Sequence, residues 1–375
     1  MPGWHAKTKD LVAAGDLKVV GIVQEQHPDR AALFMQWHQM DWPVLADPFN
    51  LLQVKAVPYT FLIDEHGVIR YKNPKQADLE KFLATDYPAE PLGGGTGKLA
   101  FGESVAEHQL LYQPAARESV EQLERRAAEN PEHALTRFRL GVAYRMIHDS
   151  PQREPGDFAK AVAAWRRALD MDPGQYIWRR RIQQYGPRLD KPYSFYDWVP
   201  RAREEIVARG DEPRRLGAEP GGAEFAERRD VAGAEPGEHP DPQVKLPPDS
   251  GKLVSAEVTV VPSTDTKKRA YRVHLRFTPD PEKKVHWTND AGPLSFFLDG
   301  TGGAEVRDLP GPVSAPREEA SSEVRSIEFE VRPAAGEEVP KLLTGTAFYY
   351  VCEDVDGQCL FLRQDVAIFL RRSDE

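Results

Sequence analysis

The stretch that decides the fold of the last third of the chain is TAFYYVCEDVDGQCLF, residues 346–361. It contains the only two cysteines of the chain, Cys352 and Cys359, and their closeness indicates that they form a pair. Cys352 ends an aromatic strand, residues 354–357 supply a turn, and Cys359 opens the return strand. Across such a hairpin the two Cα atoms can reach the roughly 4.4–6.8 Å that a disulfide needs.

Strand patterns surround this hairpin. Apolar and polar residues alternate over residues 254–260 and again over residues 270–277, which is the period of a strand. Similar runs lie at 294–298, 324–331, 346–351 and 366–370, so at least six strands are expected. Short strands separated by glycine and proline predict an antiparallel, all-β sandwich over residues 251–375.

Length and charge limit the remaining possibilities. A chain of 375 residues is long enough for two or three domains. The net charge of −10 argues against a protein that binds nucleic acid or an anionic membrane, because both need a basic surface. No apolar run approaches the roughly 18 residues of a membrane span, and no signal peptide is recognisable at the start.

Composition divides the chain into five segments. Two of them, residues 89–115 and 201–250, are rich in glycine, proline or charged residues and are predicted to be linkers. The second linker should be flexible, which would leave the last domain tethered. The other segments are an α/β unit over 1–88, a helical region over 116–200 and the β-sandwich over 251–375.

The first segment alternates strands and helices. We expect a helix over 4–14, a buried strand over 17–23 and a second helix over 29–41. Two strands at 59–63 and 68–71 should form a hairpin whose turn uses Gly67, and residues 77–83 should form a closing helix. Asp64 is interpreted as a residue of this turn.

Residues 116–185 predict two helical hairpins. Pro131 and Pro173 each follow the end of a helix and lie 42 residues apart. The small and aromatic residues between them resemble a tetratricopeptide repeat of about 34 residues, lengthened by a loop at 149–156: Leu140, Gly141, Ala143, Tyr144, Ala161, Trp165 and Ala168. So few repeats should dock on a neighbouring domain, either as a plain helical spacer or as a peptide-binding unit. The aromatic segment 185–199 should lie as an ordered strap on a domain surface.

Residues 54–64, VKAVPYTFLID, together with Gly67 resemble the thioredoxin-like fold in its TlpA and peroxiredoxin branch. The resemblance implies that the Val57–Pro58 bond is cis. It also implies that Val57 and Pro58 bind a peptide substrate opposite the redox cysteines. In that family a Cys-x-x-Cys motif follows the first strand, and neither the strand nor the motif is found here. The missing strand would be internal, so a gap between strands is expected.

Two explanations for this departure stay open. The true start may lie upstream, with the redox motif and an export signal; periplasm or cell envelope would then be the location. Alternatively, the first segment is a redox-dead remnant, and as recorded the chain would stay in the cytosol. We favour the upstream start.

Residues 252–370 resemble the N-terminal domain of the thiol:disulfide interchange protein DsbD. The resemblance rests on FYYVC at 348–352 and DGQC at 356–359, with weaker support from HWTND at 286–290 and GPL at 292–294. It implies an immunoglobulin-like sandwich whose cysteine pair takes electrons from a membrane partner and passes them to other proteins. By this analogy Cys352 and Cys359 are catalytic and Cys359 attacks. Six residues separate the cysteines where five are usual, and Leu360-Phe361 replaces the usual Pro-Pro.

The sequence therefore predicts a multidomain protein: an incomplete α/β thioredoxin-like unit, α-helical tetratricopeptide-like hairpins and an immunoglobulin-like sandwich. The predicted function is thiol–disulfide exchange with redox partner proteins, without metal or organic cofactor. The alternative is a non-catalytic scaffold or protein-binding module in which Cys352–Cys359 is a structural disulfide.

Overall fold

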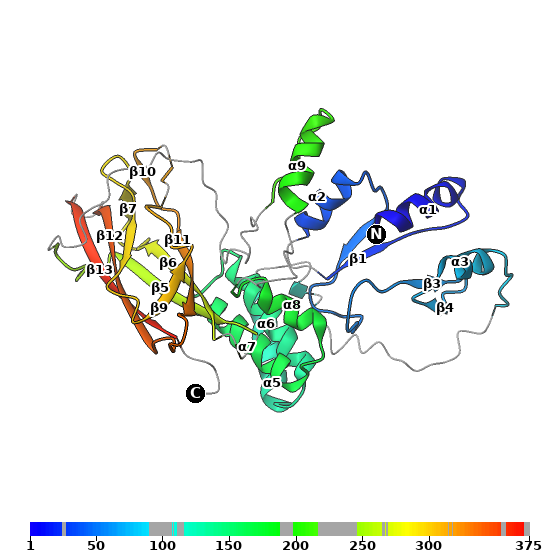
Figure 1. Cartoon of the computed structure of the whole chain (residues 1–375), viewed down its shortest axis with the longest axis horizontal. Coiled ribbons are helices and arrows are strands. Elements are labelled where there is room, and N and C mark those ends of the chain that lie inside the picture. Colours follow the sequence, from blue (N-terminus) through cyan, green and yellow to red (C-terminus); the bar gives the residue numbers. More distant parts are fainter. Residues whose placement is uncertain are drawn as a thin grey trace.

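The structure, a computed structural model, describes residues 1–24, 28–89, 107, 109–110, 116–187, 198–216, 246–264, 267, 269–313, 315–316, 318–353 and 358–370. Helices and several antiparallel sheets form three units (Figure 1). We call them the first unit (residues 1–89), the helical unit (107–187) and the β-sheet unit (246–370). In Figure 1 the helical unit lies between the other two.

The first unit contains three helices and four short strands: α1 (Pro2–Ala14), β1 (Gly21–Val23), α2 (Asp29–Trp37), β2 (Val44–Ala46), β3 (Phe61–Ile63), β4 (Ile69–Lys72) and α3 (Gln76–Leu83). Each expected helix or strand has a counterpart, although the one expected at 17–23 is shorter and not buried, and β2 is an addition that no pattern indicated. β1 pairs with β2 in parallel and β3 pairs with β4 in antiparallel orientation. These pairs form two separate sheets, which agrees with the expected gap between strands.

The prediction of a buried strand over residues 17–23 was wrong. Only Gly21–Val23 form a strand, and its side chains alternate, with Ile22 46% exposed. β1 has a single neighbouring strand in its sheet, so its apolar side chains are not enclosed as they would be inside a larger parallel sheet.

The turn between β3 and β4 is organised by Asp64. Gly67 takes the predicted left-handed conformation, with φ 80°. The Asp64 carboxylate accepts hydrogen bonds from the backbone N–H of His66 at 3.0 Å and of Val68 at 2.9 Å, and from Arg70 Nε at 2.6 Å. Burial opposes its ionisation, but these donors outweigh burial and hold the pKa of Asp64 below its ordinary value.

We therefore expect Asp64→Asn to destabilise the first unit at neutral pH. The pKa of Asp64 is lower in the folded protein than in the unfolded chain, where it is about 3.9. The ionised carboxylate therefore stabilises the fold above that pH, and this stabilisation is lost as the pH falls through the folded pKa. Thermal unfolding of the parent and the variant should differ at pH 7 and converge in acid. Asp86→Asn, at an exposed carboxylate of the same unit, is the control; an equal effect there would contradict the role of Asp64.

The helical unit contains the two predicted hairpins: α5 (Arg117–Glu129), α6 (Ala134–His148), α7 (Asp157–Met171) and α8 (Tyr176–Gln183). α5 and α7 each end two residues before a proline, Pro131 and Pro173 respectively, as expected. The closest approach is at Gly141 of α6, where an added Cβ would lie 2.4 Å from Cδ1 of the fully buried Trp165 of α7. Only glycine leaves room for the indole at this crossing.

Gly141→Ala should therefore destabilise the helical unit by about 1–3 kcal/mol through overpacking. Denaturant unfolding followed by tryptophan fluorescence measures the effect. Gly3→Ala is the matched control, because Gly3 also lies in a helix but has open space around it. It should be neutral or slightly stabilising. A stable Gly141→Ala protein would contradict this packing.

Two segments assigned to linkers are partly ordered and packed. Residues 201–208 belong to α9 (Trp198–Ala208), whose buried Val199, Ala202 and Ile206 form one apolar face on α2. Trp198 stacks on Trp37 of α2 with ring centroids 5.9 Å apart. The buried Glu107 and Leu110 lie inside the predicted linker 89–115. Residues 90–106, 108, 111–115 and 217–245 of the two predicted linkers lie outside the described residues.

The predicted strap at residues 185–199 is described only at its ends. Tyr185 is fully buried and stacks on Trp165 with centroids 5.7 Å apart. At the other end, Trp198 and Val199 belong to α9. Residues 188–197 lie outside the described residues.

The described part of the β-sheet unit contains nine strands: β5 (Val254–Pro262), β6 (Tyr271–Pro279), β7 (Val285–Thr288), β8 (Ser295–Leu298), β9 (Ala304–Arg307), β10 (Ala320–Ser321), β11 (Arg325–Pro333), β12 (Leu342–Glu353) and β13 (Gln358–Phe369). One sheet has the order β5-β6-β11-β9, and the other has β10-β7-β12-β13 with β8 also on β12. All pairs are antiparallel, and side chains from both sheets share one core. The six predicted strands are all present.

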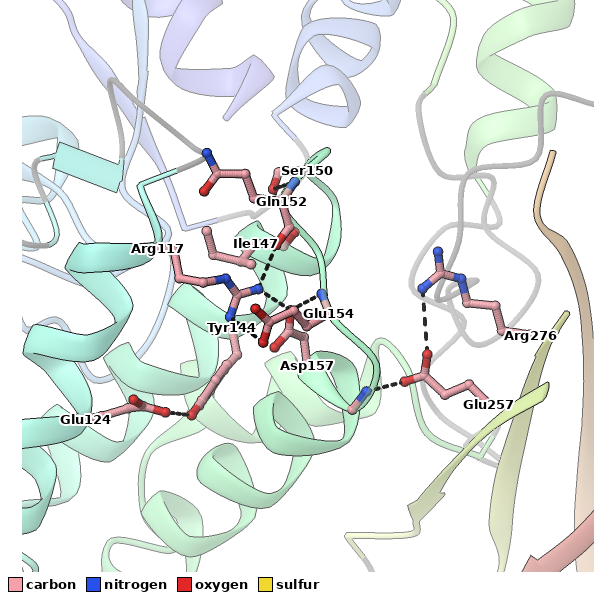
Figure 2. A network of polar contacts seen from close by, with 11 residues as sticks. Arg117, Glu124, Tyr144, Ile147, Ser150, Gln152, Glu154, Asp157, Glu257 and Arg276 are labelled. Carbon is pink, nitrogen blue, oxygen red and sulfur yellow. Dashed lines mark hydrogen bonds and ion pairs between the residues drawn. The ribbon is translucent and has the colours of Figure 1, made fainter. Parts of the chain in front are cut away.

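The helical unit packs on the outer face of the first of these sheets. His274 of β6 contacts the backbone oxygen of Tyr185 through Nε2 at 2.9 Å, and its ring meets Phe158 of α7 edge-on. A second link is the hydrogen bond that Gly156 N–H donates to Glu257 of β5 at 2.7 Å; Figure 2 shows the side chain of Glu257. The β-sheet unit is thus in contact with the helical unit and is not merely tethered to it, because the polar face of β6 is buried against α7.

The helical unit also packs against the first unit and hydrogen-bonds to it. Phe49 belongs to the core of the helical unit and is fully buried there. The buried Arg181 of α8 donates to the backbone oxygens of Gln24 at 2.9 Å and Pro48 at 3.2 Å. The prediction that the helical hairpins dock on a neighbouring domain is confirmed on both sides.

Candidate functional site

The two cysteines lie opposite each other near the end of the longest strand pair in the described part of the chain. β12 and β13 pair without interruption from Leu342↔Phe369 to Glu353↔Gln358. In this register Cys352 faces Cys359, their Cα atoms are 3.9 Å apart, and the sulfurs form a disulfide. The predicted pairing of the two strands and of the two cysteines is confirmed, with a Cα separation slightly below the usual range. The predicted turn, residues 354–357, lies outside the described residues.

The two sulfurs lie in different surroundings. Cys352 is 8% exposed, because β12 has a neighbouring strand on each side. On β7, His286 is in register with Cys352, and the Thr288 hydroxyl lies 3.0 Å from Cys352 Sγ. Cys359 is exposed, because β13 is the last strand of its sheet. One sulfur is therefore open to an incoming group and the other is held inside.

An aromatic stack adjoins the disulfide on the same face of the sheet. Tyr350 and Phe361, two residue pairs further along the ladder, stack with centroids 4.0 Å apart and planes 5° apart. Phe348 lies next to them, 6.4 Å from Phe361. Gly292 approaches Tyr350 so closely that an added Cβ would lie 3.0 Å from its ring. These contacts stiffen the hairpin on the side of the disulfide.

This arrangement allows an external thiolate to attack one of the two sulfurs, that of Cys359. An incoming thiolate can reach Cys359 Sγ, form a new S–S bond there and break the bond to Cys352. Cys352 leaves as a thiolate, and the Thr288 hydroxyl is within hydrogen-bond distance to donate to it. In the reverse direction the exposed Cys359 is the sulfur that attacks.

Val57 and Pro58, the predicted substrate-binding residues, lie elsewhere. Their peptide bond is cis, as the thioredoxin resemblance implies. Val57 is 48% exposed in the loop before β3. β3 and the β12–β13 pair lie at opposite ends of Figure 1, with the helical unit between them. The structure therefore does not bring Val57 and Pro58 to Cys352 and Cys359.

The sequence reasoning missed the hydroxyl of Thr288 as a member of this site. Its only signal was its place in the HWTND stretch, which had no assigned role beyond the resemblance. Among the residues that the structure describes, no group of three or more histidine, cysteine and carboxylate side chains is placed to hold a metal ion. Within the same residues, no helix has both the length and the apolar character needed to cross a membrane.

Comparisons with known proteins add little. No protein-family profile matches the sequence, and no curated protein is significantly similar to it. Two solved structures are similar to about a third of the chain: a FixG-related protein from Vibrio parahaemolyticus and the GAE domain of GGA2p from Saccharomyces cerevisiae. The first is 6% identical over 31% of this chain and 95% of its own, with a TM-score of 0.19. The second is 14% identical over 33% and 96%, with a TM-score of 0.22. Similarity this weak supports no conclusion about function.

Thr288→Val should make the disulfide harder to reduce. The substitution removes a hydrogen bond worth about 0.5–1.5 kcal/mol to the sulfur that leaves as a thiolate. At about 30 mV per 1.4 kcal/mol, the reduction potential should fall by roughly 10–30 mV. Titration against a thiol buffer measures it. Thr346→Val is the control on β12, because that hydroxyl contacts Asp299 and Asp365 instead of sulfur. An unchanged potential for Thr288→Val would remove Thr288 from the site.

Proposed function

We propose that this protein carries out thiol–disulfide exchange with protein partners through Cys352 and Cys359. The observation that carries the proposal is the asymmetry of the pair: Cys359 is exposed, whereas Cys352 is buried beside a hydroxyl donor. Exchange needs one sulfur that a thiolate can reach and a second that leaves readily. A bridge with a purely structural role needs neither property.

The fold assignments belong to the same proposal. Two face-packed antiparallel sheets support an immunoglobulin-like sandwich of the DsbD N-terminal kind for the β-sheet unit. The order of helices and strands in the first unit supports a thioredoxin-like fold, and the close contact of Gly141 with Trp165 supports tetratricopeptide-like packing of the helical unit. In this proposal the first unit has no dithiol chemistry of its own, and Val57 and Pro58 offer a polypeptide-binding loop.

The cysteines should behave differently when each is left alone. In the Cys352→Ser protein the remaining Cys359 should be alkylated quickly and should trap partner proteins as mixed disulfides. In the Cys359→Ser protein the buried Cys352 should react at least about tenfold more slowly, because access limits its attack. Alkylation followed by mass spectrometry gives both rates. Equal rates would contradict the assigned asymmetry.

A redox titration of the full chain tests the function itself. A reduction potential above about −300 mV is that of a labile pair and supports exchange. A lower potential, or a bond that resists strong reductant, would mark a structural disulfide. The contacts that the helical unit makes with both neighbouring units would then favour the alternative of a non-catalytic scaffold.

A further inference from the structure

The free edge of β13 begins at the exposed cysteine. Among the described strands β13 pairs only with β12. Cys352 and Cys359, 3.9 Å apart at Cα, have the short spacing of a non-hydrogen-bonded antiparallel pair. The backbone N–H and C=O of Cys359 therefore point away from β12. The same holds two and four residues further on, for Phe361 and Arg363.

Arg363 shows that this edge accepts an extended segment. Its N–H donates to the backbone oxygen of Pro247 at 3.1 Å, and its C=O accepts from Asp249 N–H at 2.9 Å. Pro248 forms a parallel bridge with Arg363. The Asp249 carboxylate anchors the segment by accepting from the Tyr349 hydroxyl at 2.9 Å.

In the described part of the chain, the backbone hydrogen bonds between this segment and β13 are all at Arg363. In a parallel ladder, the next bond toward Cys359 would run from the N–H of residue 247 to the C=O of Phe361. Residue 247 is a proline and has no N–H. In the described part of the chain, no residue bonds the outward backbone groups of Phe361 or Cys359.

We propose that the β13 edge from Cys359 to Phe361 binds an extended, cysteine-bearing segment of a protein substrate as an added strand. The inference rests on the proposed exchange function and names its substrate: extended polypeptide, recognised mainly through main-chain hydrogen bonds. Opposing side chains on adjacent antiparallel strands lie about 4.5–5.5 Å apart at Cβ, which brings a substrate cysteine to Cys359. The Phe361–Tyr350 stack offers an apolar surface to the substrate side chain two residues away.

At this edge two substrate thiols are oxidised to a disulfide while the Cys352–Cys359 disulfide is reduced. The substrate thiol loses its proton to solvent, and its thiolate attacks Cys359 Sγ. The Cys352–Cys359 bond breaks, and Cys352 leaves as a thiolate beside the Thr288 hydroxyl. A second substrate thiolate then attacks the substrate sulfur of the mixed disulfide. The substrate leaves oxidised as a disulfide, and the cysteine pair has gained two electrons.

The first test compares two peptides on the full-length protein. One is an unstructured peptide of about eight residues with a central cysteine; the other is identical but N-methylated at the amide of the cysteine and at the amide two residues away, because these N–H groups face β13 when the cysteine lies opposite Cys359. Added-strand binding predicts that methylation slows reduction of the disulfide about tenfold, because backbone hydrogen bonds are lost. The rate with 2-mercaptoethanol, which has no backbone, is the reference. Equal rates for the two peptides would overturn the proposal.

A second test uses variants of the edge. Phe361→Ala removes the ring and keeps the outward N–H, whereas Phe361→Pro removes both at a position where an edge proline is tolerated. The peptide should reduce the Cys352–Cys359 disulfide more slowly in Phe361→Pro than in Phe361→Ala, whereas 2-mercaptoethanol should reduce it at the same rate in both. Near-UV circular dichroism checks that both variants fold.

Binding can also be measured without any redox step. A serine version of the peptide should shift the amide NMR signals of Cys359 and Phe361 in the oxidised protein. If these signals shift but no thiol reduces the pair, the result supports strand binding at the edge and contradicts the exchange function. If thiols reduce the pair but the signals do not shift, the exchange function stands and the edge site is refuted.

Discussion

The uninterrupted pairing of β12 with β13 is the constraint on which the candidate site depends. Twelve residue pairs fix the register from Leu342↔Phe369 to Glu353↔Gln358, and a slip of one residue would move every side chain to the opposite face. In the observed register one face supplies Tyr349 and Val351 to the core, and the other carries Phe348, Tyr350 and Cys352. The disulfide therefore adds a covalent link to an alignment that core packing already requires.

The helical unit contacts both the β-sheet unit and the first unit. α7 covers polar residues of β6, and Arg181 of α8 satisfies backbone oxygens of the first unit. Alternating polar residues usually face water, yet Arg272, His274 and Arg276 are all buried. They tolerate burial because ionic and hydrogen-bonding partners accompany them, such as Glu328 at 3.2 Å from His274. The same covering leaves the opposite sheet, with its cysteines, open at the β13 edge.

The local elements could be predicted from the sequence, and the contacts between them could not. Period-two alternation located the long strands, and Pro131 and Pro173 located the ends of two helices. β2 has three residues and too little pattern to be recognised. The packing of α9 on α2, and the burial of Glu107 and Leu110, depend on partners far away in the chain. At the site, the cysteine pairing followed from spacing, whereas the exposure of each sulfur depends on which strand lies at the sheet edge.

The contact between α2 and α9 has a consequence for synthesis. Trp37 donates to Glu205 across 168 residues of chain, with the whole helical unit between them. A ribosome that adds about 5–20 residues per second makes α2 roughly ten to thirty seconds before α9. During that interval Leu33 and Trp37 present an uncovered apolar face to the surrounding solution. The nascent chain is thus exposed to association with chaperones or other chains until α9 emerges.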